Sequence, residues 1–170
     1  KTQLKWLQRS LPNTEYVAIA NKETVESIAD KLKNTTFDQL VWIAPETTSK
    51  TSIQISITAQ EIGVLEIYRI TKALLEAGLA DKTLNWSFIT QCTQKVINND
   101  IVNFTHASVI GFVGSLAKEY PNWNIRLADI DTFKTITAKS CLSLPWNEQG
   151  NVLAHRQGEW FSQEFAYVSS

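Results

Sequence analysis

The sequence contains no methionine, and it has only two cysteines and six glycines among 170 residues. Cys92 and Cys141 have no further Cys or His at ligand spacing, which disfavours a disulfide scaffold and a zinc site. Two buried thiols in a reducing cytoplasm are the expected alternative. Because not even residue 1 is Met, we expect the chain to be a piece of a longer polypeptide or a processed product.

An excess of one charge and long hydrophobic runs are also missing. The net charge is −1 and the pI is about 6.2, so no basic surface is predicted to bind nucleic acid. No apolar run approaches the roughly 18 residues that a membrane span needs, and residues 1–12 are too polar for a signal peptide. A hydrophobic content of 44% and a charged content of 19% are typical of a globular chain. We expect a single domain over residues 1–170, with 1–15 as a linker or N-terminal extension.

Strand-like and helix-like segments alternate along the chain. Short apolar runs with the pattern of buried strands lie at residues 16–20, 39–44, 84–90 and 123–130. Helices are predicted after Asn21, over about 59–77, from the N-cap Thr105 to Pro121, and within 132–142. Residues 151–156 and 159–167 predict a hairpin that turns at Gln157-Gly158. This order indicates an α/β fold, a truncated Rossmann-like unit with a mostly parallel sheet flanked by helices and a C-terminal β-hairpin.

A glycine-rich turn after the first strand is missing. Rossmann-like proteins hold a pyrophosphate with such a turn, because only glycine lets the backbone approach the phosphates closely. None of the glycines forms such a turn here; they are Gly63, Gly78, Gly111, Gly114, Gly150 and Gly158. The predicted turn after residues 16–20 contains Glu23, whose charge repels phosphate. We therefore predict that this chain has no cofactor-binding residues.

One pattern is typical of an enzyme. Tyr68 and Lys72 stand one helical turn apart, and Ser56 lies a dozen residues upstream, as in the catalytic set of short-chain dehydrogenases. Tyr-x-x-x-Lys is common by chance, however, and hydride transfer needs the nicotinamide cofactor whose turn is missing. Tyr68 also falls in the middle of an apolar helix face with Val64, Ile67, Thr71 and Leu75. We predict that Tyr68 is a packing residue.

The other candidate residues favour structural roles. Gly111 and Gly114 are predicted to let their helix approach the sheet or another helix closely, and His106 is predicted to be a surface or capping residue. Asp129 and Asp131 end a strand, where ligands bind in α/β sheets, but without a third acid nearby a solvated strand end is favoured. His155 in the hairpin is interpreted as incidental. No catalytic and no metal-binding residue is predicted.

Aromatic residues are frequent in the terminal segments. Trp6 and Trp160 are expected to contribute to a contact surface rather than to the core. The hairpin carries more apolar side chains than a lone domain usually exposes, namely Trp160, Phe161, Phe165 and Tyr167. A partner is therefore predicted to bind along this hairpin.

Residues 103–131, NFTHASVIGFVGSLAKEYPNWNIRLADID, closely resemble a segment of modular polyketide synthase ketoreductases, loosely N-P-x-H-A-x-x-x-G-L-x-x-S-L-A-x-E-x-P followed by a strand ending in D-x-D. Residues 58–79 and the C-terminal hairpin resemble further family segments, so the resemblance covers about 16–167. Phe104 stands where Pro is common. Ile125 and Arg126 bring the strand closer to the trans-acyltransferase type of synthase.

The resemblance implies that the chain is the N-terminal, structural half of a two-part ketoreductase. In that family the first half binds no cofactor, and the second half uses NADPH to reduce a β-ketoacyl group on acyl carrier protein. The expected partners are the catalytic subdomain and neighbouring synthase domains including acyl carrier protein, and the chain alone is expected to catalyse nothing. Two alternatives stay open: a free-standing dehydrogenase that uses Ser56, Tyr68 and Lys72, and a pseudo-ketoreductase that braces a neighbouring methyltransferase or dehydratase.

Overall fold

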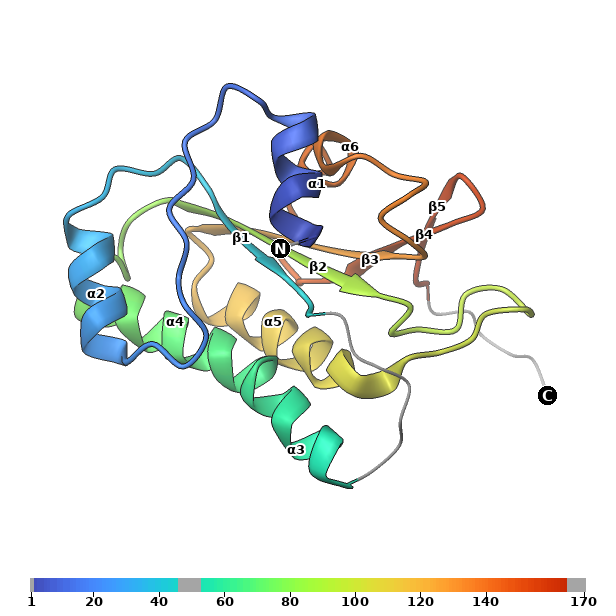
Figure 1. Ribbon diagram of the computed structural model, residues 1–170, viewed down its shortest axis with the longest axis horizontal. Helices are drawn as coiled ribbons and strands as arrows, with labels where there is room; N and C mark the ends of the chain where they lie inside the picture. Colours follow the sequence, from blue (N-terminus) through green and yellow to red (C-terminus); the bar gives the residue numbers. More distant parts are fainter. Residues whose placement is uncertain (1, 46–52, 165–170) are drawn as a thin grey trace.

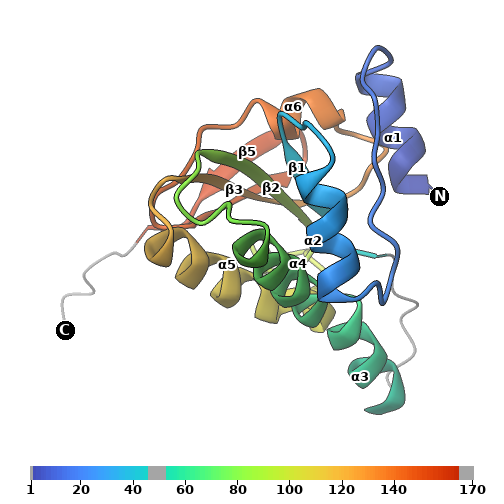
Figure 2. The ribbon, with the colours of Figure 1, turned by 90° about the vertical axis from the view of Figure 1, so that its left-hand side faces the viewer.

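The protein has three layers, with a twisted sheet between two layers of helices (Figures 1 and 2). The computed structural model describes residues 2–45 and 53–164, and the side chains among these except 53–56. Helices α1 (Thr2–Ser10) and α6 (Ala138–Leu142) cover one face of the sheet. The other face carries α2 (Val25–Lys33), α4 (Val64–Glu76) and α5 (Ala107–Glu119), and α3 (Ile53–Glu61) precedes α4.

The sheet has the order β1-β2-β3-β4-β5 in the described part of the chain. Its first four strands are parallel and its last is antiparallel; the strands are β1 (Leu40–Ile43), β2 (Leu84–Gln91), β3 (Trp123–Ile130), β4 (Val152–Arg156) and β5 (Glu159–Ser162). β2 and β3 lie between neighbours and are buried on both faces, which is why their sequences are apolar with little alternation. The α/β fold with a mostly parallel sheet is confirmed.

The predicted C-terminal hairpin is also confirmed. Gln157 and Gly158 connect β4 and β5, and both have a positive φ, of 52° and 88°. Two-residue turns with this backbone match the twist of paired strands. The partner surface predicted here is smaller than expected in the described part, because Trp160 and Phe161 are half-buried and Trp160 packs edge-on against His155. Phe165 and Tyr167 lie outside the described residues.

The strand predicted at residues 16–20 is wrong. Its backbone groups bond to side chains of α2 and the turn before it: Lys31 Nζ donates to the Ala18 carbonyl, and Ala20 N–H donates to Glu23. Val17 is 59% exposed, so this apolar run does not enter the sheet. The cap of α2 is Thr24 rather than Asn21, because the Thr24 hydroxyl accepts the Ser27 N–H.

The single helix predicted over 59–77 is divided in two at Gly63. A Cβ at Gly63 would lie 2.7 Å from Nδ1 of His106, so glycine allows His106 to pack directly on the backbone. The buried face of α4 consists of Ile67, Ile70, Thr71, Ala73 and Leu74. Tyr68 is 48% exposed, which corrects the prediction that it is a core residue. The apolar pattern placed Tyr68 on the buried face of α4. In the structure α2 packs beside α4, so the buried residues of α4 are those that face the sheet and α2.

Two hydrophobic cores lie on opposite faces of the sheet. The larger lies between the sheet and α2, α4 and α5, and it includes Trp86, Phe88, Trp123 and Val113. The smaller lies under α1 and α6 and includes Trp6. Trp6 is only 7% exposed and its Nε1 donates to the Ile136 carbonyl at 2.8 Å, so its predicted place on a contact surface is wrong. Helix α1, within the predicted N-terminal extension, is thus packed against the sheet.

The close approach predicted for the glycine pair of α5 occurs at only one of the two positions. Gly114 contacts the turn before β4, and a Cβ on Gly150 in that turn would lie 2.7 Å from Gly114 Cα. A Cβ at Gly111 would meet nothing within 4 Å. The helix is therefore held against β4 through Gly114 and Gly150, while Gly111 faces outward.

We predict that Gly150→Ala destabilises the fold much more than Gly158→Ala. Both positions have a positive φ, of 66° and 88°, but the space around Gly158 is open whereas at Gly150 the new Cβ collides with backbone. The matched control Gly158→Ala is expected to lose about 1 kcal/mol through backbone strain alone. Gly150→Ala is expected to lose more than about 2 kcal/mol in urea unfolding, and equal losses would contradict the tight contact.

Candidate functional site

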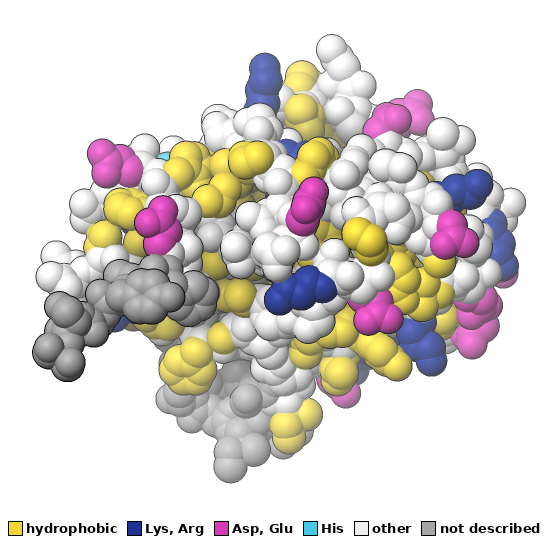
Figure 3. Space-filling model, turned by 180° about the vertical axis from the view of Figure 1, so that it is seen from behind, with side chains coloured by type: hydrophobic (Ala, Val, Ile, Leu, Met, Phe, Trp, Pro, Cys, Tyr) yellow, Lys and Arg dark blue, Asp and Glu magenta, His cyan; other side chains and the backbone are white. Residues whose placement is uncertain are grey.

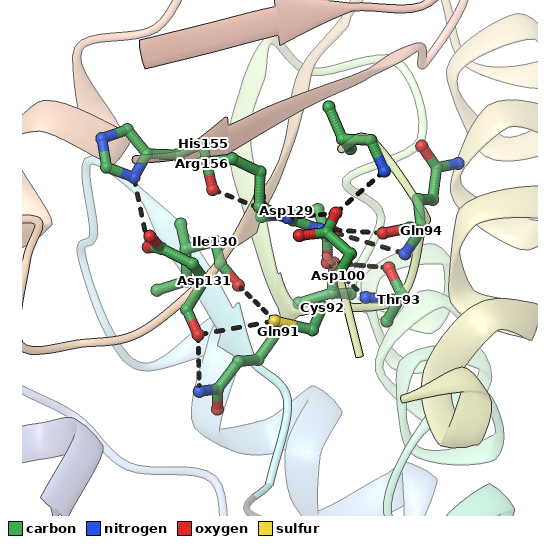
Figure 4. Close-up of polar contacts among 12 residues, drawn as sticks. Gln91, Cys92, Thr93, Gln94, Asp100, Asp129, Ile130, Asp131, His155 and Arg156 are labelled. Atoms are coloured by element: carbon green, nitrogen blue, oxygen red, sulfur yellow. Dashed lines mark hydrogen bonds and ion pairs between the residues drawn. The ribbon is translucent and has the colours of Figure 1, made fainter. Parts of the chain in front are cut away.

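Buried polar residues gather where β2, β3 and β4 end (Figure 4). Thr90 comes from β2, Asp129 from β3 and Arg156 from β4, and the loop after β2 adds Thr93 and Asp100. Because the carboxyl ends of parallel strands meet at one edge of the sheet, residues distant in sequence become neighbours here. This edge is also where α/β proteins place their ligands, so it is the first candidate for a functional site.

Asp129 is the centre of the cluster. Its Oδ1 accepts hydrogen bonds from the Thr90 hydroxyl at 2.7 Å and from the N–H and hydroxyl of Thr93 at 2.9 and 2.8 Å. Its Oδ2 accepts Arg156 Nη2 at 2.6 Å. The residue is 0% exposed, which corrects the prediction of a solvated strand end.

Arg156 uses all five of its N–H groups. Its Nε donates to Asp100 at 2.9 Å, Nη1 donates to the carbonyls of Asp129 and His155, and Nη2 donates to Gln94 O and Asp129. Burial alone lowers the pKa of Arg156, but the carboxylates of Asp129 and Asp100 outweigh it and raise the pKa. A guanidinium whose donors are all occupied offers none to a ligand, so the cluster braces the loop after β2 against the strand ends.

Asp100 closes the same loop. Burial works to raise its pKa, but the N–H groups of Val96 and Ile97 and the guanidinium of Arg156 donate to the carboxylate, and together they lower the pKa. Asp100 is the third acid that the sequence did not reveal beside Asp129, and it reaches the cluster from a loop between two elements. The acids of this cluster, Asp100 and Asp129, are thus ion-pair partners of Arg156.

Asp131 and His155 form a second pair at the strand ends. His155 Nδ1 and Asp131 Oδ1 are 3.3 Å apart, and His155 is buried, so its interpretation as incidental is wrong. Burial works to raise the pKa of Asp131, but hydrogen bonds from Thr132 N–H, His155 and the Thr135 hydroxyl outweigh it and lower the pKa. This pair fixes the start of the loop after β3.

A cavity of about 440 Å³ lies beside these strand ends, between β1, the loops after β2 and β3, and α1. His106 lines it and is buried, edge-on to Trp42, which corrects the prediction of a surface or capping residue. Burial lowers the pKa of His106. Neither ring nitrogen of His106 makes a hydrogen bond of ordinary geometry, and both are shielded from solvent. The predicted N-cap Thr105 lies instead in the short helix Phe104–His106, where its N–H donates to the Asn103 side chain.

The dehydrogenase-like residues lie away from this edge. Tyr68 projects from the outer side of α4 against Phe112 of α5, with ring centres 6.3 Å apart. Lys72 Nζ lies 5.8 Å from the centre of the Tyr68 ring. Neither residue lines the cavity, and the side chain of Ser56 lies outside the described ones. In the described part of the chain Tyr68 and Lys72 are not brought to the strand ends.

Glu23 lies just before the N-terminus of α2 and is bound by groups of this chain. Glu23 accepts the Ala20 N–H at 2.8 Å, the Ser27 hydroxyl at 2.8 Å and Lys31 Nζ at 2.9 Å. The hydrogen bond from Lys31, with those from Ala20 and Ser27, lowers the pKa of Glu23 to about 2. Nucleotide-binding proteins use such a helix N-terminus for phosphate.

Of the two thiols that were expected to be buried, Cys141 is buried and Cys92 is partly exposed. Cys92 and Cys141 are free, and burial raises the pKa of Cys141 to about 12. Among the described residues no three His, Cys, Asp or Glu side chains are placed to hold a metal ion. No helix in residues 2–45 and 53–164 is long and apolar enough to cross a membrane.

The cluster around Asp129 had one sign in the sequence that was not recognised, which is an arginine in an apolar strand. Arg156 ends an otherwise apolar strand, and Arg126 interrupts another. A charged residue in a buried strand requires partners. Arg126 finds them in the carbonyls of Leu142 and Leu144 and in the ring of Trp146, whose centre is 3.3 Å from the guanidinium carbon.

Comparison with solved structures places the fold among ketoreductases and carbonyl reductases. A structure of the first ketoreductase of the tylosin polyketide synthase matches 94% of this chain and 35% of that one, with a TM-score of 0.66 and 14% identity. The NADPH-bound carbonyl reductase from chicken fatty liver matches 90% of this chain and 79% of its own, with a TM-score of 0.57 and 12% identity. The chain thus has a Rossmann-like fold that is similar to the folds of ketoreductases and carbonyl reductases.

Relatives with a similar sequence indicate the class of protein more narrowly than the solved structures do. Polyketide synthase PksN of Bacillus subtilis (strain 168) is 34% identical over 158 residues, and PksM of the same strain is 34% identical over 160 residues. These matches cover 92% and 94% of this chain but only 3% and 4% of the relatives. No family model matches the sequence. The chain is homologous to a segment of bacterial polyketide synthases, as the resemblance predicted.

We predict that Arg156→Met lowers the free energy of unfolding by about 3 to 5 kcal/mol, because it leaves Asp129 charged, buried and without its cation. Arg9→Met, at an exposed position of α1, is the control and is expected to change stability by less than about 0.5 kcal/mol. Adding Asp129→Asn to Arg156→Met is expected to restore part of the loss. A loss below about 1 kcal/mol for Arg156→Met in denaturant unfolding would contradict the role of Arg156 in holding the loop after β2 against the strand ends.

We predict that Glu23→Gln removes a pH-dependent part of the stability. A carboxylate whose pKa falls from 4.5 to about 2 on folding stabilises the fold fully above pH 4.5, and this contribution is lost as the pH falls toward 2. The stability difference between wild type and Glu23→Gln is therefore expected to be largest near neutral pH and to shrink on acidification. Glu148→Gln, at an exposed position, is the control. A pH-independent difference would contradict the role of the ionised carboxylate.

Proposed function

We propose that this chain is the non-catalytic half of a polyketide synthase ketoreductase, and that it binds and stabilises a catalytic half. That catalytic half reduces a β-ketoacyl group on acyl carrier protein with NADPH. A cytoplasmic location and a trans-acyltransferase type of synthase belong to the same proposal, the first supported by the two free thiols and the second by Ile125 and Arg126.

The observation that carries the proposal is the share of each chain in the match to the tylosin ketoreductase. Nearly the whole of this chain, 94%, corresponds to 35% of that ketoreductase. In that comparison the chain corresponds to one part of a larger reductase, and the rest of such an enzyme would supply what this part does not.

The sequence of this chain also supports the proposal that the cofactor is bound by another part of the enzyme. The first glycine in the sequence is Gly63, so no glycine-rich turn precedes α2 or β1. The carboxylate of Glu23, just before α2, is bound by Ala20 N–H, the Ser27 hydroxyl and Lys31. Its negative charge near this helix N-terminus disfavours a pyrophosphate there.

The placement of Tyr68 and Lys72 favours this proposal over a free-standing dehydrogenase. A proton donor for hydride chemistry has to face the reacting carbonyl beside the nicotinamide, which in this class of fold lies at the strand ends. Tyr68 instead faces outward between α4 and α5. A pseudo-ketoreductase that braces a methyltransferase or dehydratase is the remaining alternative, and it predicts a different polypeptide sequence after Ser170.

We predict that this chain does not bind NADPH at micromolar concentrations, because it has no backbone turn for the pyrophosphate. Calorimetric titration of the chain is the measurement. The matched control is the natural polypeptide that continues past Ser170, which is expected to bind NADPH and to contain a strand and a glycine-rich turn there. Tight binding to the chain alone would contradict the proposal, and a continuation without such a turn would favour the pseudo-ketoreductase.

A further inference from the structure

The cavity beside the strand ends has the size of a small-molecule site. Its volume is about 440 Å³, and pockets for small ligands usually measure roughly 300 to 1,000 Å³. It lies at the carboxyl edge of the sheet, where α/β proteins bind ligands, and its walls come from the ends of β1, β2 and β3 and from α1. Gln91 and Cys92, at the end of β2, are the part of this wall that Figure 4 shows.

The charge of the cavity wall has one sign. None of the described residues that line the cavity is acidic, and Lys134 among them forms no ion pair with a described residue. Asp131 precedes the lining residue Thr132, but its carboxylate bonds to His155 and Thr135. On the molecular face that Figure 3 shows, by contrast, acidic and basic side chains are interspersed. The cavity therefore favours an anion.

The N-terminal end of α1 adds hydrogen-bond donors to the same wall. Thr2, the first residue of this nine-residue helix, lines the cavity, and the first turn contains no acid. The first N–H groups of a helix have no partner within the helix, and the aligned peptide dipoles give this end a partial positive charge. Trp6 of the same helix donates to the Ile136 carbonyl and packs edge-on against Phe133, so α1 is fixed to the loop that carries Lys134.

His106 is an independent sign of a ligand. Its side chain lines the cavity and is 3% exposed, and neither ring nitrogen makes a hydrogen bond of ordinary geometry in the described part of the chain. Buried polar groups in proteins are nearly always hydrogen-bonded, so this side chain lacks a partner that the fold itself does not provide. A neutral imidazole has one N–H group, and a carboxylate oxygen in the cavity would accept from it once the ring turns toward the ligand.

We propose that this cavity binds a small organic monocarboxylate. Its carboxylate lies between Lys134 and the first turn of α1, where a cation and backbone donors complement an anion. Its apolar part lies against Phe133, Ala44 and Pro45. One lysine balances one negative charge, whereas a doubly charged phosphate would keep a charge without a partner. The inference goes beyond the proposed function and does not rest on it, because it involves neither NADPH nor a catalytic half.

Calorimetric titration of the 170-residue chain with hexanoate, hexanamide and inorganic phosphate tests the class of ligand. Hexanamide has the length of hexanoate without its charge, and phosphate has the charge without an apolar part. Hexanoate is expected to bind with a Kd below about 1 mM, and the other two at least about tenfold more weakly. No measurable binding of hexanoate overturns the proposal, and so does equally tight binding of hexanamide or phosphate.

A pair of lysine variants tests the position of the charge. Lys134→Met removes the cation of the cavity wall at an exposed position, so the melting temperature is expected to stay the same. Lys139→Met, at an exposed position of α6 that does not line the cavity, is the matched control. Lys134→Met is expected to weaken hexanoate binding by at least about fivefold, and Lys139→Met by less than about twofold. Equal effects of the two variants overturn the proposed placement of the carboxylate.

The two thiols locate the bound ligand. Cys92 is partly exposed and lines the cavity, whereas Cys141 is buried in the smaller core. Saturating hexanoate is expected to slow alkylation of Cys92 by iodoacetamide at least about fivefold, and Cys141 is expected to stay unmodified as long as the chain is folded. The measurement is mass spectrometry of the alkylated peptides. Hexanoate binding that leaves the alkylation rate of Cys92 unchanged places the ligand elsewhere and overturns the proposal.

Discussion

Arg156 is the residue on which the carboxyl edge of the sheet depends. It is buried at the end of β4, and its five donors join β3, the loop after β2 and its own strand. Asp100 and Asp129, the two acids that pair with Arg156, are largely removed from water. Their negative charges are therefore tolerated only while the guanidinium group stays in place. The loop after β2 in turn leads to Asn103 and the start of α5, so the position of that helix depends on the same contact.

The polar residues at the strand ends bond mainly to one another, which fits the scaffold role that we propose. The strand ends carry acids and a histidine, as functional sites do, but here each acid is paired with Arg156 or His155 and neighbouring hydroxyl and N–H groups. Just before α2, the carboxylate of Glu23 is likewise bound by Ala20 N–H and Lys31. Polar groups of the kind that bind substrates in other proteins thus bond to one another in this chain, and these contacts stabilise the fold.

The central strands and the hairpin could be predicted from the sequence, because they are specified locally. Residues 123–130 form β3 with the predicted bounds, since an apolar run between Pro121 and Asp131 has few other structures available. The run at 16–20 has similar residues but forms no strand, because its backbone groups bond to Lys31 and Glu23. Burial of Tyr68 was predicted from helical spacing alone, and that spacing does not reveal on which sides a helix has neighbours.

The polar cluster could not be predicted for a related reason. Asp129 and Asp100 are 29 positions apart in the sequence and meet only through Arg156, which comes from a third segment. The only local sign was an arginine at the end of an apolar strand, and that sign does not name its partners. Histidines were misjudged similarly, since burial of His106 depends on the space that Gly63 leaves free.

The contact between Gly114 and Gly150 has a mechanical consequence. Backbone touches backbone there, with no side chain between them that could rotate to absorb a displacement. Any push on α5 from outside is therefore passed to the turn that begins β4, and β4 ends at Arg156. The helix and the turn are thus in direct backbone contact at this point, and neither can move toward the other unless the chain itself shifts.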